Sequence, residues 1–83
     1  MSIGQIVFAK CGRDKGNAFV VIQLQDDEYL YLVDGKSRTL HKPKKKKAKH
    51  VQPTHHIANL DVGSRGLQDA DVRKELRRLL VLN

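Results

Sequence analysis

The chain has 83 residues, with 16 Lys and Arg against nine Asp and Glu, and a formal net charge of +7 at neutral pH. This length suits one domain, and because aromatic residues make up only 5% of the chain, the core must be mainly aliphatic. No apolar run approaches the ~20 residues of a membrane span. The N-terminus has no basic region followed by an apolar stretch, so we expect a cytoplasmic protein without membrane contact.

The first predicted element is a β-hairpin, with strands over residues 5–11 and 17–25. Both stretches are rich in Val, Ile and Phe, as strands require. The Gly-Arg-Asp-Lys-Gly pentad at 12–16 separates them, and its glycines can adopt positive φ in a tight reversal. Arg13 and Lys15 would then stand at the tip, where they are suited to contact a phosphate backbone.

Two further residues of this region have predicted roles. Asp14 lies between the two cations and is expected to hold the turn through a local side-chain bond. Cys11 closes the first strand and is interpreted as a small apolar packing residue, with a reactive thiol beside Arg13 and Lys15 as the alternative. A single cysteine cannot form an internal disulfide, which agrees with a reducing compartment.

Two more strands are predicted after an acidic turn at 26–28. Residues 29–33 alternate in a half-buried pattern, and Asp34-Gly35 is a hairpin signal that leads to a short fourth strand over 37–41. Pro43 and the lysines that follow are expected to interrupt regular structure.

A fifth strand is predicted over residues 49–52, ended by Pro53. Several short strands joined by tight turns favour a small closed barrel, because closure removes exposed sheet edges.

The net charge is concentrated in residues 35–50, which hold eight Lys and Arg and no acid. The rest of the chain holds eight basic and nine acidic side chains. A solvated loop that only aids solubility is one interpretation, but a block of four consecutive lysines repels itself unless an anion neutralises it. A nucleic-acid backbone is the preferred partner, while an acidic membrane surface lacks support from a lipidation signal or an apolar helix face.

The few aromatic residues favour contact with phosphate and sugar over base stacking. The two histidines that border the lysines could add charge beside an anionic partner. The candidate RNA-binding residues are therefore Arg13, Lys15, Lys36, Arg38, His41, Lys42, Lys44, Lys45, Lys46, Lys47, Lys49 and His50.

The C-terminal part is predicted to contain a connector over 57–68 and a helical segment over 69–83, with the helix itself at about 69–81. Ile57 and Leu60 are expected to be pinned to the barrel. The helix carries one apolar stripe, which either packs on the barrel or docks on a partner protein or a second copy. The stripe consists of Val72, Leu76, Leu79 and Leu80.

No catalytic or metal constellation is evident. Histidines at positions 55 and 56 adjoin each other, but the spacing of common zinc ligands is absent. No Ser/His/Asp order, paired carboxylates in an apolar setting or phosphate-binding glycine loop stands out. We therefore expect neither an enzyme nor a cofactor.

Three parts of the chain together resemble a known motif. The run at 4–8, the pentad at 12–16 and the strand at 19–22 resemble a KOW motif, which ribosomal proteins share with transcription factors of the NusG type. The resemblance continues through 29–35 and into 36–54, where it is similar to the KOW-bearing large-subunit ribosomal proteins of archaeal and eukaryotic type, especially the family of protein fourteen.

This resemblance covers residues 1–56 and implies an SH3-like barrel that includes the basic loop 36–50. It also implies a non-catalytic protein that binds structured ribosomal RNA. Stable membership of the ribosome and transient association during its assembly both stay open, because the chain after the predicted barrel departs from these relatives. The rival hypothesis is a protein-interaction KOW module of a transcription or translation factor, which would dock through its helix stripe.

Overall fold

The structure is a computed structural model that describes residues 1–81, so positions 82 and 83 of the predicted helical segment lie outside the described residues. Five antiparallel strands form one sheet in the order β4-β3-β2-β1-β5, and a single helix follows. The elements are β1 (Gln5–Ala9), β2 (Ala18–Leu24), β3 (Tyr29–Val33), β4 (Lys44–Lys47), the short 3₁₀ helix η1 (Ala48–His50), β5 (Val51–Ile57) and α1 (Asp69–Val81).

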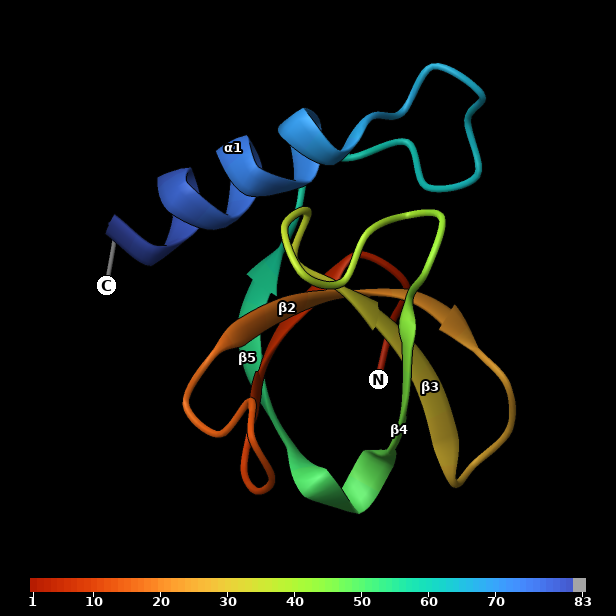
Figure 1. Cartoon of the computed structure of the whole chain (residues 1–83), viewed down its shortest axis with the longest axis vertical. Coiled ribbons are helices and arrows are strands. Elements are labelled where there is room, and N and C mark those ends of the chain that lie inside the picture. Colours follow the sequence, from red (N-terminus) through yellow and green to blue (C-terminus); the bar gives the residue numbers. More distant parts are fainter. Residues whose placement is uncertain (82–83) are drawn as a thin grey trace.

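Both faces of the central strands are buried. On one face, Ile6 of β1 pairs with Val20 of β2, which pairs with Val33 of β3, and α1 covers this row. The opposite face curls around a second cluster that includes Val7 and Phe19. Figure 1 shows α1 across the outside of the curled sheet. Because side chains alternate between faces along a strand, double coverage explains why β2 is apolar at consecutive positions.

The strand predictions are confirmed for the first three strands, are wrong for the fourth and are right only in part for the fifth. Residues 37–41 form a loop, because the turn after β3 leads the chain under α1. The fourth strand is instead the lysine run itself, Lys44–Lys47, paired with β3. The fifth strand continues through Pro53 to Ile57. An edge strand tolerates proline because the missing N–H removes no ladder bond on its solvent side.

The sheet is not closed, contrary to the predicted complete barrel. Within residues 1–81, β4 and β5 form the two edges and are joined through η1 without pairing with each other. A closed barrel would have no exposed edge strands. Here the lysines on β4 and the proline on β5 discourage pairing of these two edges with further strands. The prediction of a mainly β protein with one C-terminal helix is confirmed.

The helix packs on the sheet through its predicted apolar stripe. Val72, Leu76 and Leu79 are buried with the β1–β3 row, while Leu80 is half-buried. Burying a side chain of this size stabilises the fold by about 1.5–3 kcal/mol relative to exposure. The interpretation of the stripe as a docking face for a partner or a second copy is therefore wrong for these three buried residues. Of the residues predicted to be pinned, Leu60 packs on this cluster but Ile57 is exposed.

A clamp holds the loop after β3 against the first turn of α1. The backbone N–H of Leu40 donates to Asp69 Oδ1 at 2.8 Å, and Arg73 Nη1 donates to the carbonyl of Gly35 at 2.6 Å. Gly35 has a φ of +78°, and a Cβ there would lie 2.5 Å from the carbonyl oxygen of Asp69. A glycine is therefore required both for the turn and for the close approach of the helix.

Replacing this glycine should destabilise the fold more than replacing a glycine in open space. Gly16 is the matched control because its φ is +87° and nothing lies within 4 Å of an added Cβ. We expect G16A to lower the free energy of unfolding by about 1–2 kcal/mol through backbone strain. G35A should lower it further, because the helix must also move. Urea unfolding measures both, and equal losses would contradict the clamp.

A buried carboxylate ties α1 to the connector. Glu75 is only 9% exposed, and its Oε1 accepts the backbone N–H of Asn59 at 2.6 Å. Arg78 donates to both oxygens, at 2.9 and 3.0 Å. The hydrogen bond from Arg78 lowers the pKa of Glu75, although burial acts in the opposite direction.

Because the folded-state pKa of Glu75 is lowered, its stabilising contribution is present above the unfolded pKa of about 4.3 and is lost as pH falls below it. We expect E75Q to lower the free energy of unfolding at pH 7 and to flatten its decline as the pH falls below about 4.3. Urea titrations at a series of pH values measure this. The control is D61N, an exposed connector carboxylate, which should keep the wild-type acid profile.

Candidate nucleic-acid interface

The hairpin tip, residues 12–16, forms as predicted between β1 and β2. Gly12 and Gly16 have φ values of +83° and +87°. Backbone bonds close the turn, from the N–H of Gly16 to the carbonyl of Ala9 at 2.9 Å and from the N–H of Asn17 to the carbonyl of Asp14 at 2.9 Å. Arg13 and Lys15 are exposed at this tip. The tip therefore presents two cations on a backbone fixed by its own hydrogen bonds.

Asp14 connects the tip to the basic segment and does not hold the turn through its side chain, contrary to the prediction. Its Oδ2 lies 3.7 Å from Arg38 Nη2 and 3.8 Å from Lys44 Nζ. The carboxylate is 19% exposed, so these contacts are partly shielded from water. Arg38 Nε is buried and has no hydrogen-bond partner among the described residues. Asp14 thus holds Arg38 and Lys44 beside the tip, but some of their N–H donors are left without an acceptor within residues 1–81.

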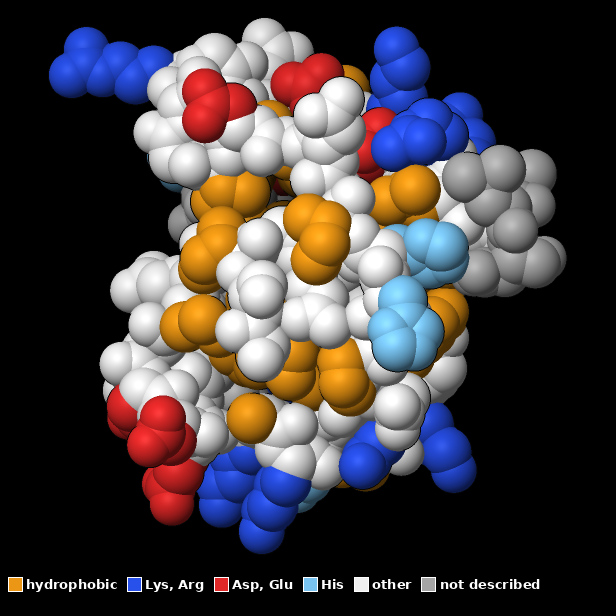
Figure 2. Space-filling view, turned by 180° about the vertical axis from the view of Figure 1, so that it is seen from behind, with side chains coloured by type: hydrophobic (Ala, Val, Ile, Leu, Met, Phe, Trp, Pro, Cys, Tyr) orange, Lys and Arg blue, Asp and Glu red, His pale blue; other side chains and the backbone are white. Residues whose placement is uncertain are grey.

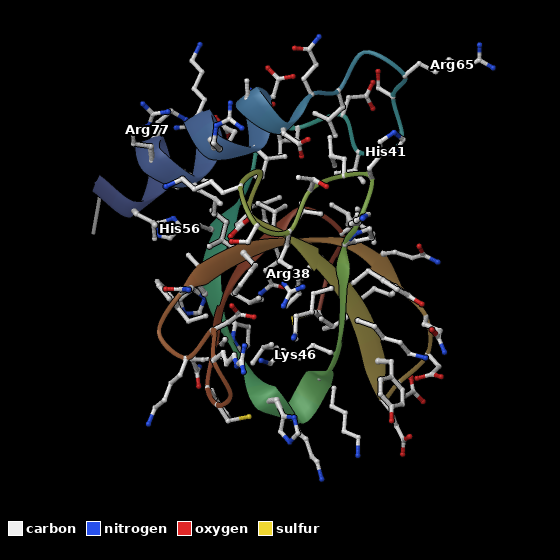
Figure 3. All side chains as sticks on the ribbon, viewed as in Figure 1. Arg38, His41, Lys46, His56, Arg65 and Arg77 are labelled. Atoms are coloured by element: carbon white, nitrogen blue, oxygen red, sulfur yellow. The ribbon has the colours of Figure 1, made fainter. Side chains whose placement is uncertain are left out.

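Lys46 is buried inside the curled sheet and is only 9% exposed. Its Nζ donates to the carbonyl of Cys11 at 3.0 Å, which joins β4 to the start of the turn. Figure 3 shows Arg38 and Lys46 together within the outline of the sheet. Cys11 itself is exposed, so its predicted packing role is wrong. It lies in the turn after β1 ends, where its carbonyl, and not its side chain, makes the structural contact.

Lys45 and Lys47 lie on the other face of β4 from Lys44 and Lys46. Lys45 and Lys47 are exposed, and Lys45 Nζ lies 4.7 Å from the centroid of the Tyr29 ring, a cation–π contact. Lys49 and His50 follow in η1, where the carbonyl of His50 accepts the N–H of Lys10 at 2.8 Å. That bond places η1 beside the base of the tip.

The other basic residues of the predicted loop lie elsewhere. His41 and Lys42 are exposed in the loop held under α1, and His41 lies far from Lys46 in Figure 3. Lys36 lies beside α1, where it lines a groove with Arg73 and Arg77. The structure therefore divides the segment predicted as one basic loop among three places: the tip end of the sheet, the outer face of β4, and the α1 side.

Three cations that sequence reasoning missed adjoin these sites. Lys10 is exposed near the tip, and its position two residues before the pentad was an available signal. Arg73 and Arg77 belong to α1, and neither was predicted to be a binding residue. Their approach to Lys36 depends on how α1 docks, which the sequence alone does not specify.

The reverse face of the molecule is more apolar at its centre. Figure 2 shows apolar side chains across its centre, with Lys and Arg toward the upper and lower rims. Over all described residues, on every face, the exposed large apolar side chains include Met1, Ile3, Leu24 and Ile57. Over residues 1–81, the single helix is too short and too polar to cross a membrane, and no three His, Cys, Asp or Glu side chains are grouped to hold a metal ion.

No model of a known protein family matches the chain. Two curated relatives are large ribosomal subunit proteins eL14, from Staphylothermus marinus and Desulfurococcus amylolyticus. They are 26% and 29% identical to this chain over 76 residues, which is 92% of this chain and 76% of each relative. The chain is thus similar to ribosomal proteins of the eL14 type. The resemblance stated from the sequence is thus confirmed, and it extends beyond residues 1–56 into the C-terminal part.

The four lysines of β4 should respond differently to substitution because they face opposite sides. K46A removes a buried aliphatic stem and the donor to Cys11, so the free energy of unfolding should fall by about 1–3 kcal/mol. K47A removes an exposed charge on the same strand and should change it by less than about 0.5 kcal/mol. Urea unfolding compares them, and equal values would show that Lys46 is not a structural residue.

Proposed function

We propose that this protein is a non-catalytic RNA-binding protein of the ribosome, which binds structured ribosomal RNA through phosphate contacts. The observation that carries the proposal is the contact of Asp14 with Arg38 and Lys44, because it joins the hairpin tip to the basic segment. Cations that are distant in sequence thereby share one end of the sheet. That end carries Lys10, Arg13, Lys15, Arg38, Lys44, Lys46, Lys49 and His50.

The electrostatics of this end favour a polyanion. Asp14 is the acid that contacts the cluster, so the positive charge there is only partly neutralised. Arg38 and Lys44 are half-buried, and partial burial strengthens their attraction to a phosphate oxygen relative to open water. Tyr29 and Tyr31 lie beyond this cluster on the outer face of the sheet, so phosphate and sugar contacts are favoured over stacking.

The relatives support ribosomal RNA as the proposed partner. Both are described as proteins of the large ribosomal subunit, and the match covers nearly all of this chain. We therefore infer a role in the large subunit, in the cytoplasm where ribosomes act. The rival protein-interaction hypothesis relied on the helix stripe, and the burial of Val72, Leu76 and Leu79 removes its docking surface.

The double variant R13Q/K15Q tests the tip directly. Each phosphate contact contributes about 0.7–0.9 to the slope of log K against log[salt], so loss of two contacts should reduce that slope by about 1.4–1.8. Binding to purified large-subunit ribosomal RNA, measured by filter binding between 50 and 300 mM KCl, gives the slope. Both side chains are exposed and have no hydrogen bond or ion pair among the described contacts, so folding should be unaffected.

The matched control is R65Q/K74Q, which removes the same charge from the connector and the far side of α1. Both residues are exposed, and Figure 3 shows Arg65 at the opposite end of the molecule from Lys46. The control should keep the wild-type slope. Equal slopes for R13Q/K15Q and the wild-type protein would contradict the proposed function, as would equal losses in the two double variants.

A further inference from the structure

A groove of about 710 Å³ runs between α1 and the hairpins that face it. One wall is the turn after β3 together with the start of β2, and the other wall is α1. This volume lies within the range of about 300–1,000 Å³ that ligand sites occupy. Its lining residues are Asn17, Ala18, Asp34, Lys36, Ser37, Arg73, Leu76, Arg77 and Leu80.

The charge of this groove is positive. Lys36, Arg73 and Arg77 face it, while Asp34 is the one acid among the described residues of its lining. Asp34 Oδ1 already accepts the backbone N–H groups of Lys36 and Arg38, at 2.8 and 2.9 Å, so that carboxylate is engaged in the turn. Arg73 is fixed by its bond to the carbonyl of Gly35. The groove therefore has one immobilised and two free-standing cations.

The groove is continuous with the hairpin tip. Asn17, which lines it, directly follows Gly16, the last residue of the tip. We propose that this groove is a second phosphate-backbone site, where Lys36, Arg73 and Arg77 bind the same structured RNA as it continues past the tip. This inference rests on the proposed function and extends its RNA surface onto α1.

The lining favours a sugar–phosphate backbone over other ligands. The cations of the lining favour phosphate, and none of its described residues is aromatic, so stacked bases have no platform there. The hollow on the other side of α1 has the opposite charge, since Asp61, Asp71 and Glu75 line it with Lys74. RNA passing over α1 is thus attracted to the first groove and repelled by the second hollow.

The double variant K36Q/R77Q tests the proposal without disturbing the clamp. Both side chains are exposed and, unlike Arg73, make no hydrogen bond or ion pair with the described residues, so the variant should unfold at the same urea concentration as the wild-type protein. Its salt slope on large-subunit ribosomal RNA should fall by about 1.4–1.8, as expected for two lost phosphate contacts. R65Q/K74Q is again the control, because Lys74 lies on α1 but faces the acidic hollow.

The outcomes separate this inference from the proposed function. One RNA that spans both sites is supported if K36Q/R77Q and R13Q/K15Q each reduce the salt slope. The two reductions should then add in the quadruple variant. A reduced slope in R13Q/K15Q with a wild-type slope in K36Q/R77Q overturns the groove site and leaves the proposed function intact. A wild-type slope in both variants overturns both. A reduced slope in R65Q/K74Q of the same size would show that only net charge matters, which also overturns the groove site.

Discussion

Burial of both faces of one small sheet is the constraint on which the rest of this structure depends. The strand order places β2 in the centre, where Val20 faces α1 and Phe19 and Val21 face the curled interior. A chain of 83 residues has few apolar side chains beyond those that cover these two faces, since small domains bury a low fraction of their surface. Both faces of the central strands are therefore committed to packing, and charged groups collect at the sheet ends, on the edge strands and on the outside of α1.

Lysines on β4 reconcile charge with sheet structure. Side chains alternate between the two faces along β4. Lys44 and Lys46 therefore point toward the tip, and Lys45 and Lys47 point away from it. The long aliphatic stem of lysine can cover apolar neighbours while its ammonium reaches a polar group, as Lys46 does at the carbonyl of Cys11. The same residues discourage further strands from pairing at this edge. A basic run can thus complete a sheet, protect its edge and place cations at the proposed RNA-binding surface.

Much of the fold could be predicted from the sequence, but less of the candidate nucleic-acid interface could be. The hairpin around residues 12–16, the third strand and the helix at 69–81 followed from local signals, namely glycine turns, β-branched runs and a helical apolar stripe. The fourth strand was missed because a lysine run has a low intrinsic strand preference, and pairing with Leu30 and Leu32 overrides that preference. A closed barrel was predicted because exposed edge strands are generally unfavourable. In the structure the lysines of β4 protect one edge from further pairing, and the proline of β5 protects the other.

The site shows why charge density along a sequence is a poor guide to charge density in space. Residues 35–50 look like one basic block, yet Lys36 and His41 end up near α1, Lys46 is buried, and Lys47 faces outward. Conversely, Asp14 brings Arg38 and Lys44 to a tip that lies more than 20 positions earlier in the chain.

An acidic residue inside a basic surface is usually regarded as unfavourable for nucleic-acid binding. Here the carboxylate orders the cations around it, which lowers the conformational entropy that they would lose when RNA arrives. Its negative charge opposes binding, but the ordering it provides supports binding. An aspartate between two cations of a hairpin tip is therefore consistent with an RNA-binding surface whose cations are arranged before the RNA binds.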